Sequence, residues 1–253
     1  MKISALGKLT VYLMIRTRSD FVILIPVYDE EESLPRLYRE LTGFLAESPV
    51  STSVLFINDG SRDKSQMLIE SFAADDHRFH FIQLNKNSGL SAALKAGIDH
   101  CHCKWIGYMD ADLQTTPADF HLLLEHVGEY ELVTGIRRQR RDTPVKRVSS
   151  VIANGVRRWL INDGIEDTCC PLKIGHAAVM KRMPFFDGMH RFIPALVLMM
   201  GGKVKQVPVR HFPRLEGKAK YHLTNRLVGP FLDTLAFRWM QHHFIRYKVK
   251  NAM

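Results

Sequence analysis

The chain has 253 residues, 46% of them hydrophobic, and a formal net charge of +9 at pH 7. A chain of this length and apolar content can bury a sizeable core, which predicts a soluble globular protein with one large domain rather than two small ones. The longest apolar run, Phe192–Met200, is far shorter than the roughly 20 residues of a membrane-spanning helix, so no such helix is expected.

Residues 1–20 are interpreted as an N-terminal extension, amphipathic or disordered, that precedes the folded domain. Lys2 and Lys8 come before a short apolar patch at Val11–Ile15, but no small-residue cleavage site follows, which argues against a secretion signal. Met14 stands shortly before the first strand pattern, so a later start of the chain is an alternative interpretation.

From residue 21 onward, apolar β-branched runs alternate with helical patterns, as expected for parallel strands joined by crossover helices. Strands are predicted at 21–27, 54–57, 79–84, 105–109 and 132–134, and helices at 33–45, 64–74, 91–100 and 117–128. The pattern predicts an α/β fold with a mostly parallel central sheet flanked by helices.

Acidic and polar residues follow three of the predicted strands. They are Tyr28-Asp29-Glu30, Asn58-Asp59 and Asp110-Ala111-Asp112. Because ligands of open α/β sheets collect at the carboxyl ends of the strands, these three segments are expected to share one edge. No Gly-x-Gly-x-x-Gly follows the first strand and no P-loop pattern occurs, so a nucleotide site of another kind is indicated.

The Asp110-Ala111-Asp112 triplet is a candidate metal site. In an extended segment residues i and i+2 point to the same side, so the two carboxylates can converge on one cation. Oxygen ligands suit Mg²⁺ or Mn²⁺, which commonly bridges protein carboxylates to nucleotide phosphates. The alternative is a strand that ends in a polar turn before a helix start, since Thr116-Pro117 resembles an N-cap and N1 pair.

The four cysteines occur as Cys101, Cys103 and Cys169-Cys170, spacings that match neither a zinc finger nor a disulfide framework. They indicate a reduced, cytosolic chain.

The positive charge lies in the second half of the chain, since residues 1–126 sum to −5 and residues 127–253 to +14. Such a field attracts anionic lipid surfaces, phosphorylated ligands or nucleic acids. The basic residues are not interleaved with base-stacking aromatics, so a nucleic-acid partner is not expected.

Two basic segments are candidates for contact with a membrane surface. Arg137–Arg141 and Lys146-Arg147 lead into a helical pattern that ends near Leu160, which either lies at a bilayer interface or packs on the core with a solvated basic edge. Residues 224–240 carry Leu, Phe and Trp at helical spacing, and 241–250 are basic and aromatic. Attachment to a membrane surface, or docking on a separate membrane subunit, is the resulting hypothesis.

The ordered set of motifs resembles the family 2 inverting glycosyltransferases with the GT-A fold, and within them the polyprenyl-phosphate branch of dolichyl-phosphate mannosyltransferase. The motifs that carry the resemblance are Ile25–Glu31, Ile57–Ser61, Asn85–Gly89, Met109–Gln114, Gly135–Arg137, Asp167–Lys173 and Arg214–Tyr221. The resemblance implies a GT-A domain over residues 21–223, followed at 224–253 by an amphipathic helix and a basic tail.

The resemblance also implies roles for particular residues. The donor nucleotide sugar is expected to contact Pro26, Tyr28, Glu30, Asp59, Asp110, Ala111, Asp112, Gln114 and Arg137, and the metal to contact Asp110, Asp112 and Gln114. The acceptor phosphate is expected at Arg147, Arg214 and Lys220, and the catalytic residues are expected to be Asp112, Asp167, Arg137 and Arg214.

Three positions depart from the family pattern. Asn58 stands where many relatives carry Asp, which would affect recognition of the base, and Ala219 replaces a common Ser. Cys170-Pro171 replaces a small-Gly pair. The donors considered are GDP-mannose and a UDP-hexose, and the expected location is the cytoplasmic face of a membrane, with the protein attached peripherally.

The chemistry can be argued from charge. Loss of a nucleoside diphosphate from an anomeric carbon builds negative charge on the leaving group, which a divalent cation and arginines stabilise. A lipid monophosphate acceptor is largely dianionic at neutral pH, because its second pKa is about 6, and needs no strong base. The alternative acceptor, a saccharide hydroxyl in cell-envelope polysaccharide synthesis, would need a general base, for which Asp167 is the candidate. Asp167 has other possible roles in this interpretation: it could orient the acceptor or a cation, cap a helix N-terminus or form a salt bridge. A catalytically inactive regulatory module is a further alternative.

Overall fold

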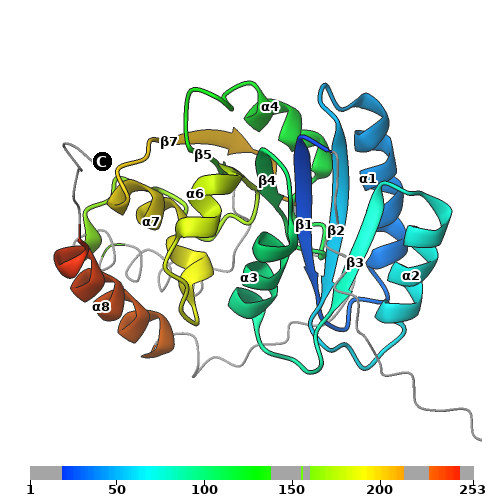
Figure 1. Cartoon of the computed structure of the whole chain (residues 1–253), viewed down its shortest axis with the longest axis horizontal. Helices are drawn as coiled ribbons and strands as arrows, with labels where there is room; N and C mark the ends of the chain where they lie inside the picture. Colours follow the sequence, from blue (N-terminus) through cyan, green and yellow to red (C-terminus); the bar gives the residue numbers. More distant parts are fainter. Residues whose placement is uncertain (1–18, 138–154, 156–159, 214–227, 246–253) are drawn as a thin grey trace, which may run out of the picture.

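The computed structural model describes residues 19–137, 155, 160–213 and 228–245 (Figure 1). Its elements in chain order are β1 (Phe21–Val27), α1 (Leu34–Glu47), β2 (Thr52–Asn58), α2 (Ser65–Asp75), β3 (Phe79–Gln83), α3 (Leu90–His100), β4 (Trp105–Tyr108), η1 (Pro117–Asp119), α4 (Phe120–Leu124), β5 (Leu132–Arg137), β6 (Lys173–His176), α6 (Ala177–Arg182), η2 (Met189–Phe192), α7 (Ile193–Met199), β7 (Val204–Val209) and α8 (Val228–His243).

Seven strands form one sheet in the order β3-β2-β1-β4-β6-β5-β7. β1, β2, β3 and β4 pair in parallel, and β5 pairs in parallel with β7. β6 is antiparallel to both of its neighbours, β4 and β5. The predicted α/β fold with a mostly parallel sheet is therefore confirmed, and β6 is the strand that joins its two parallel parts.

Strand β1 shows why the sheet is buried on both faces. Phe21, Ile23 and Ile25 belong to a core with the buried residues of α1, α2 and α4, whereas Val22 and Leu24 belong to a core with those of α3, α6 and α7. All five side chains are fully buried. Alternating side chains of an unbroken apolar strand thus pack against two helical layers, as is typical of parallel sheets. Figure 1 shows helices on both faces of the sheet.

The predicted elements that differ most in length from the observed ones are the helix at 117–128 and the strands at 54–57 and 132–134. The strand predicted at 54–57 is observed at 52–58. The helix predicted over 117–128 is a 3₁₀ turn followed by α4, which ends at Leu124. The chain then turns through Gly128, whose φ is +97°, toward β5. The strand predicted at 132–134 continues to Arg137, because all six residues of β5 pair with β7.

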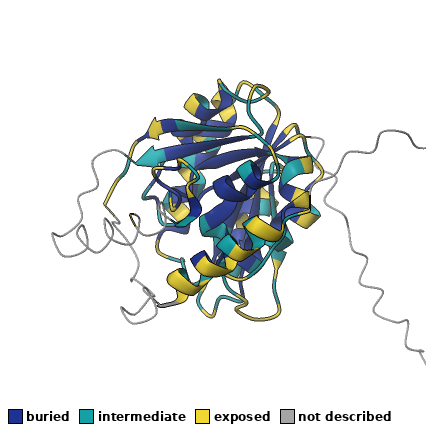
Figure 2. Ribbon diagram, turned by 90° about the vertical axis from the view of Figure 1, so that its left-hand side faces the viewer, coloured by how far each residue is buried: buried dark blue, intermediate teal, exposed yellow. Residues whose placement is uncertain are grey.

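Helix α8 packs on the core through one face and exposes the other. Phe237 is fully buried and stacks on Phe192, with ring centroids 5.1 Å apart. Large apolar side chains lie on the exposed face: Phe231, Leu232, Leu235 and Trp239 are between 42% and 65% exposed. Figure 2 views the molecule from the side on which α8 lies. Among the described residues, no helix is both long and apolar enough to cross a membrane.

Candidate nucleotide and metal site

The loops that follow β1 and β2 are joined to each other by hydrogen bonds. Ser61 Oγ accepts from the Asp29 backbone N–H at 3.0 Å, and Asp29 Oδ1 accepts from the Arg62 N–H at 2.7 Å. Glu30 donates its backbone N–H to Ser65 Oγ at 2.9 Å. Asp29 has a φ of +50°, a sparsely populated conformation for a residue with a side chain. These contacts fix the edge at which Tyr28 and Glu30 were predicted to contact the donor.

Asp59 supports the loop after β3. Its carboxylate is 4% exposed and accepts the backbone N–H groups of Ser88 at 2.7 Å and Gly89 at 2.9 Å. Gly60 has a φ of +70°, and a Cβ there would lie 2.6 Å from the Asn87 nitrogen, so the two loops cross with no space for a side chain. Asp59 therefore has a structural role, whether or not it also contacts a nucleotide.

Asn58, the departure from the family pattern, is fully buried. Its Oδ1 accepts from the Ser61 N–H at 2.9 Å, and its Nδ2 donates to Gln66 Oε1 at 2.6 Å. The side chain thus shapes the loop after β2 from within.

Asp110 and Asp112 follow β4 directly, and their carboxylates interact with each other. Burial, followed by repulsion from Asp112, raises the pKa of Asp110 to about 6, against the opposing effects of Tyr108, Lys173 and Arg137. The Tyr108 hydroxyl donates to Asp110 Oδ1 at 2.7 Å. Two mutually repelling carboxylates are a suitable environment for a divalent cation, because the cation removes the repulsion.

The turn after these carboxylates is strained and locally bonded. Leu113 has a φ of +54°, and the Gln114 N–H donates to Asp112 Oδ1 at 3.1 Å. Within the described ranges, no group of three or more His, Cys, Asp or Glu side chains is placed to hold a metal ion. The two aspartates would therefore share a cation with other oxygens, as Mg²⁺ sites do when substrate phosphates and waters complete them.

Arg137, at the end of β5, is paired with Asp167. Arg137 donates Nε to Asp167 Oδ2 at 2.8 Å, Nη2 to Oδ1 at 2.9 Å and its backbone N–H to Oδ2 at 3.1 Å. The side chains are 12% and 9% exposed. Although burial disfavours its charge, the hydrogen bonds and charge of Asp167 raise the pKa of Arg137. Among the roles considered for Asp167, the salt bridge is observed, with Arg137 as its partner.

Sequence reasoning assigned no role to Lys173 or His190. Lys173 is 2% exposed, and its Nζ donates to the carbonyls of Thr168 and Cys170, which lie just beyond Asp167. Burial lowers the pKa of Lys173. Its place at the end of the Asp167–Lys173 motif was the available signal. His190 Nδ1 lies 2.9 Å from the Ser91 hydroxyl across 99 residues of chain, and no local pattern could have indicated that contact.

A cavity of about 410 Å³ lies behind the Leu113 turn, between α1 and η1. It is lined by Arg36, Arg39, Glu40, Gly43, Phe44, Glu47, Leu113, Thr115, Thr116, Ala118, His121 and Phe212. Asp110 and Asp112 are not among the lining residues, so this cavity is not the predicted donor cleft.

The structure thus brings Asp110, Arg137 and Lys173 within electrostatic reach of one another at the end of β4 and β5. Pro26 lies at the same edge, since it pairs with Ile57 one residue before β1 ends. Ala111 is buried. Arg147, Arg214 and Lys220, the predicted acceptor-phosphate residues, lie outside the described residues.

Two relatives are similar to the chain over most of its length. One is undecaprenyl-phosphate 4-deoxy-4-formamido-L-arabinose transferase of Pseudomonas fluorescens (strain SBW25), 31% identical over 84% of this chain and 63% of the relative. The other is dodecaprenyl-phosphate galacturonate synthase of Rhizobium johnstonii, 28% identical over 90% of this chain and 68% of the relative. The chain spans about two thirds of the length of these relatives.

Solved structures of glucosyl-3-phosphoglycerate synthase from Mycobacterium tuberculosis share the fold. The complex with phosphoglyceric acid has a TM-score of 0.68 at 12% identity, covering 90% of this chain and 82% of that one. The complex with Mn²⁺ and UDP-glucose has a TM-score of 0.66 at 14% identity, covering 87% and 79%. The fold is therefore that of the GT-A glycosyltransferases. The model of the family "Glycosyl transferase family 2" matches residues 22–187, more than half of the sequence. The chain belongs to glycosyl transferase family 2.

Proposed function

We propose that this protein transfers one sugar, with inversion, from a nucleotide-diphosphate sugar to a polyprenyl phosphate at a membrane surface. The observation that carries the proposal is the arrangement of two interacting carboxylates after β4 beside the buried Arg137–Asp167 pair. The two relatives, whose names specify undecaprenyl and dodecaprenyl phosphate, support the acceptor class.

Asp110 and Asp112, with Gln114, would hold Mg²⁺ or Mn²⁺. The fit rests on two neighbouring carboxylates, because burial and then repulsion from Asp112 raise the pKa of Asp110, and a cation would stabilise both charges. When bound, a divalent ion neutralises the negative charge that develops on the departing diphosphate. The chain contributes fixed positive charge at the same edge through Arg137, whose orientation is set by Asp167 before substrate arrives.

A phosphate acceptor fits the protonation chemistry of this site. Both oxygens of Asp167 accept hydrogen bonds from Arg137, so this carboxylate is already engaged and is poorly placed to accept a proton from an acceptor hydroxyl. A dianionic phosphate needs no base, whereas a saccharide hydroxyl does. The geometry therefore favours the phosphate acceptor. Arg147, Arg214 and Lys220 remain the proposed residues that position it.

For the donor we propose a UDP-linked hexose or pentose derivative ahead of GDP-mannose. The two relatives name an arabinose derivative and galacturonate rather than mannose. A screen of nucleotide sugars by thermal shift, with and without Mn²⁺, tests this. We expect a shift for one donor that depends on the ion. A Mn²⁺-dependent shift with GDP-mannose alone would contradict the UDP preference.

The decisive experiment measures sugar transfer to short-chain polyprenyl phosphate in detergent, with the product detected by mass. We expect transfer to the lipid phosphate and none to the corresponding polyprenol. Asp112→Ala should abolish it, because the proposed cation loses a ligand. Turnover that persists in Asp112→Ala with a chelator present would refute the proposal.

The exposed face of α8 is the proposed contact with the cytoplasmic leaflet. Apolar side chains at positions 231, 235 and 239 recur every four residues and so lie on one side of the helix. Trp239 is 65% exposed, and aromatic side chains of this kind are favoured at bilayer interfaces. The net charge of +14 in the second half of the sequence favours an anionic surface.

Co-sedimentation with anionic phospholipid vesicles tests this contact. Trp239→Ser should reduce the bound fraction several-fold. Met67→Ser is the matched control, because Met67 is also apolar and 58% exposed but lies on α2, away from α8. Equal binding by wild type and Trp239→Ser would leave docking on a separate membrane subunit as the better explanation.

A further inference from the structure

The chain beyond β7 is attached at two points to the segment that follows Asp112. Asp119, in η1, is 1% exposed, accepts two hydrogen bonds from Arg210 and forms an ion pair with it. Arg210 donates its backbone N–H to Oδ2 at 2.8 Å and Nε to Oδ1 at 2.8 Å, and its Nη2 lies 2.7 Å from Oδ1. A buried carboxylate that is bonded in this way holds its partner in one orientation.

The second point of attachment is the backbone carbonyl of Gln114. It accepts the Phe212 N–H at 2.9 Å, and His211 Nδ1 lies 3.2 Å from the same oxygen. Because Arg210, His211 and Phe212 are consecutive, the Asp119–Arg210 pair determines where the Phe212 N–H points. The carbonyl of Gln114 is thus fixed by residues that follow β7 and do not belong to the turn itself.

That turn needs external support. Leu113 adopts a left-handed conformation with φ +54°, which is unfavourable for a residue with a side chain and persists only where surroundings enforce it. The Leu113 side chain packs in the core, and the turn also borders the cavity of about 410 Å³. Hydrogen bonds from the segment after β7 therefore add to the support that core packing gives this turn.

We propose that Asp119 and Arg210 are positioning residues for the metal-binding loop. Through Arg210 and Phe212 they fix the Gln114 carbonyl, and through the Gln114 N–H bond to Asp112 Oδ1 they fix the orientation of the Asp112 carboxylate. In this proposal both residues act through the loop and not by direct contact with the cation or substrate. The inference rests on the proposed function, because it assumes that Asp112 binds a divalent ion.

The test measures Mn²⁺ binding directly by calorimetry, with saturating UDP and, in parallel, saturating GDP. We expect Asp119→Asn to weaken Mn²⁺ binding about tenfold, and Arg210→Lys to weaken it less, since lysine keeps the charge but loses the two-point contact. Unchanged Mn²⁺ binding by a folded Asp119→Asn, within twofold of wild type, would overturn the inference.

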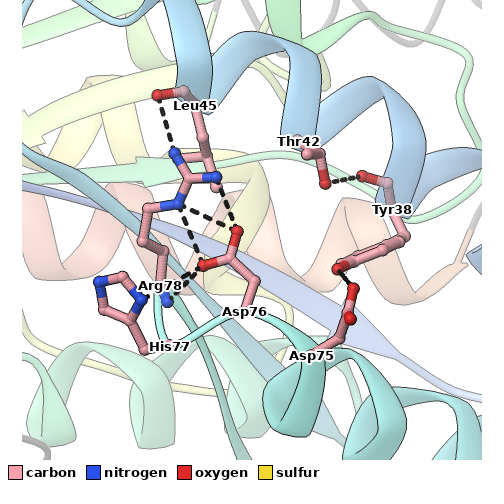
Figure 3. A network of polar contacts seen from close by, with 7 residues as sticks. All are labelled: Tyr38, Thr42, Leu45, Asp75, Asp76, His77 and Arg78. Carbon is pink, nitrogen blue, oxygen red and sulfur yellow. Dashed lines mark hydrogen bonds and ion pairs between the residues drawn. The ribbon is translucent and has the colours of Figure 1, made fainter.

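Asp76→Asn is the matched control. Like Asp119 with Arg210, Asp76 accepts hydrogen bonds from the backbone N–H and the Nε of Arg78, and it also accepts one from Nη2, but the pair lies just before β3 (Figure 3). It should lower thermal stability without altering Mn²⁺ binding. If Asp119→Asn and Asp76→Asn weakened Mn²⁺ binding equally, the effect would be general destabilisation and the inference would fail. If wild type bound no Mn²⁺ with either nucleotide, the metal site itself, and this inference with it, would fail.

Discussion

Two Asp–Arg pairs with nearly the same hydrogen bonds occupy opposite ends of the sheet. Asp76 and Arg78 lie at the amino end of β3, where Arg78 Nη1 also donates to the Leu45 carbonyl at 3.2 Å (Figure 3). Asp167 and Arg137 lie at the carboxyl end of β5. The first pair joins residues two apart in sequence and closes a turn, whereas the second joins segments thirty residues apart.

The two pairs differ in their surroundings more than in their contacts. The Asp76 and Arg78 side chains are 15% and 32% exposed, against 9% and 12% for Asp167 and Arg137. Arg137 also lowers the pKa of Asp110 in the candidate site, whereas Arg78 lowers the pKa of its own partner, Asp76. From this comparison we expect the ion pair at the carboxyl edge to orient charge for the proposed reaction, and the pair at the amino edge to stabilise a connection.

The largest expected difference follows from neutralising each acid. Asp167→Asn should lower kcat/KM about a hundredfold, because Arg137 loses the partner that orients it, a loss comparable to removing one electrostatic contact to a transition state. Asp76→Asn should leave kcat/KM unchanged. Steady-state kinetics on both variants checks this, and equal activity in the two would remove the distinction between the pairs.

The carboxyl edge should also carry a distinctive acid sensitivity. Burial, followed by the charges of Arg191 and Lys173, lowers the pKa of His190 to about 3. The unfolded chain binds a proton below about pH 6.5 that the folded chain does not, so stability is lost as pH falls from 6.5 toward 3, by about 1.4 kcal/mol per pH unit. His190→Asn should flatten the plot of unfolding free energy against pH between 5 and 6.5 in urea titrations. An unchanged slope would contradict the prediction.

Replacement of each arginine by lysine sharpens the same comparison. Lysine cannot span both carboxylate oxygens, so Arg137→Lys should lower kcat/KM about tenfold. Arg78→Lys, which loses the same two-point geometry, should have no effect on kcat/KM. A matching loss in Arg78→Lys would show that the effect reaches the site through stability, which thermal melts of both variants would reveal.

The smallest effect concerns the stability supplied by Asp76. Hydrogen bonds from Arg78 lower the pKa of Asp76, so its contribution is present above the ordinary Asp pKa and is lost as pH falls through the lowered value. Asp76→Asn should therefore cost about 1 kcal/mol at neutral pH, an amount typical of a partly exposed pair. The difference from wild type should vanish in strong acid. A cost that did not depend on pH would point to packing instead of charge.

The first half of the fold could be predicted because the strands from β1 to β4 are rich in apolar residues and alternate with helical patterns. The sequence analysis did not predict β6, α6, α7 or β7, since these elements are only four to seven residues long and β6 reverses direction. Asp110 and Asp112 were identified as a metal candidate from their spacing at the end of a strand together with the resemblance to glycosyltransferases, and that role stays a prediction. The Asp119–Arg210 contact spans 91 residues, a separation at which no local pattern carries information.

The single reversed strand β6 has a consequence for how this fold can change. It is hydrogen-bonded to β4 on one side and β5 on the other, so it separates a unit built by residues 21–108 from a second unit that contains β5 and β7. Among the described strands, no parallel pair links the two units. Because β6 lies between β5 and β7 in sequence, a hybrid of two relatives would keep both parallel ladders intact only if it were joined between β4 and β5.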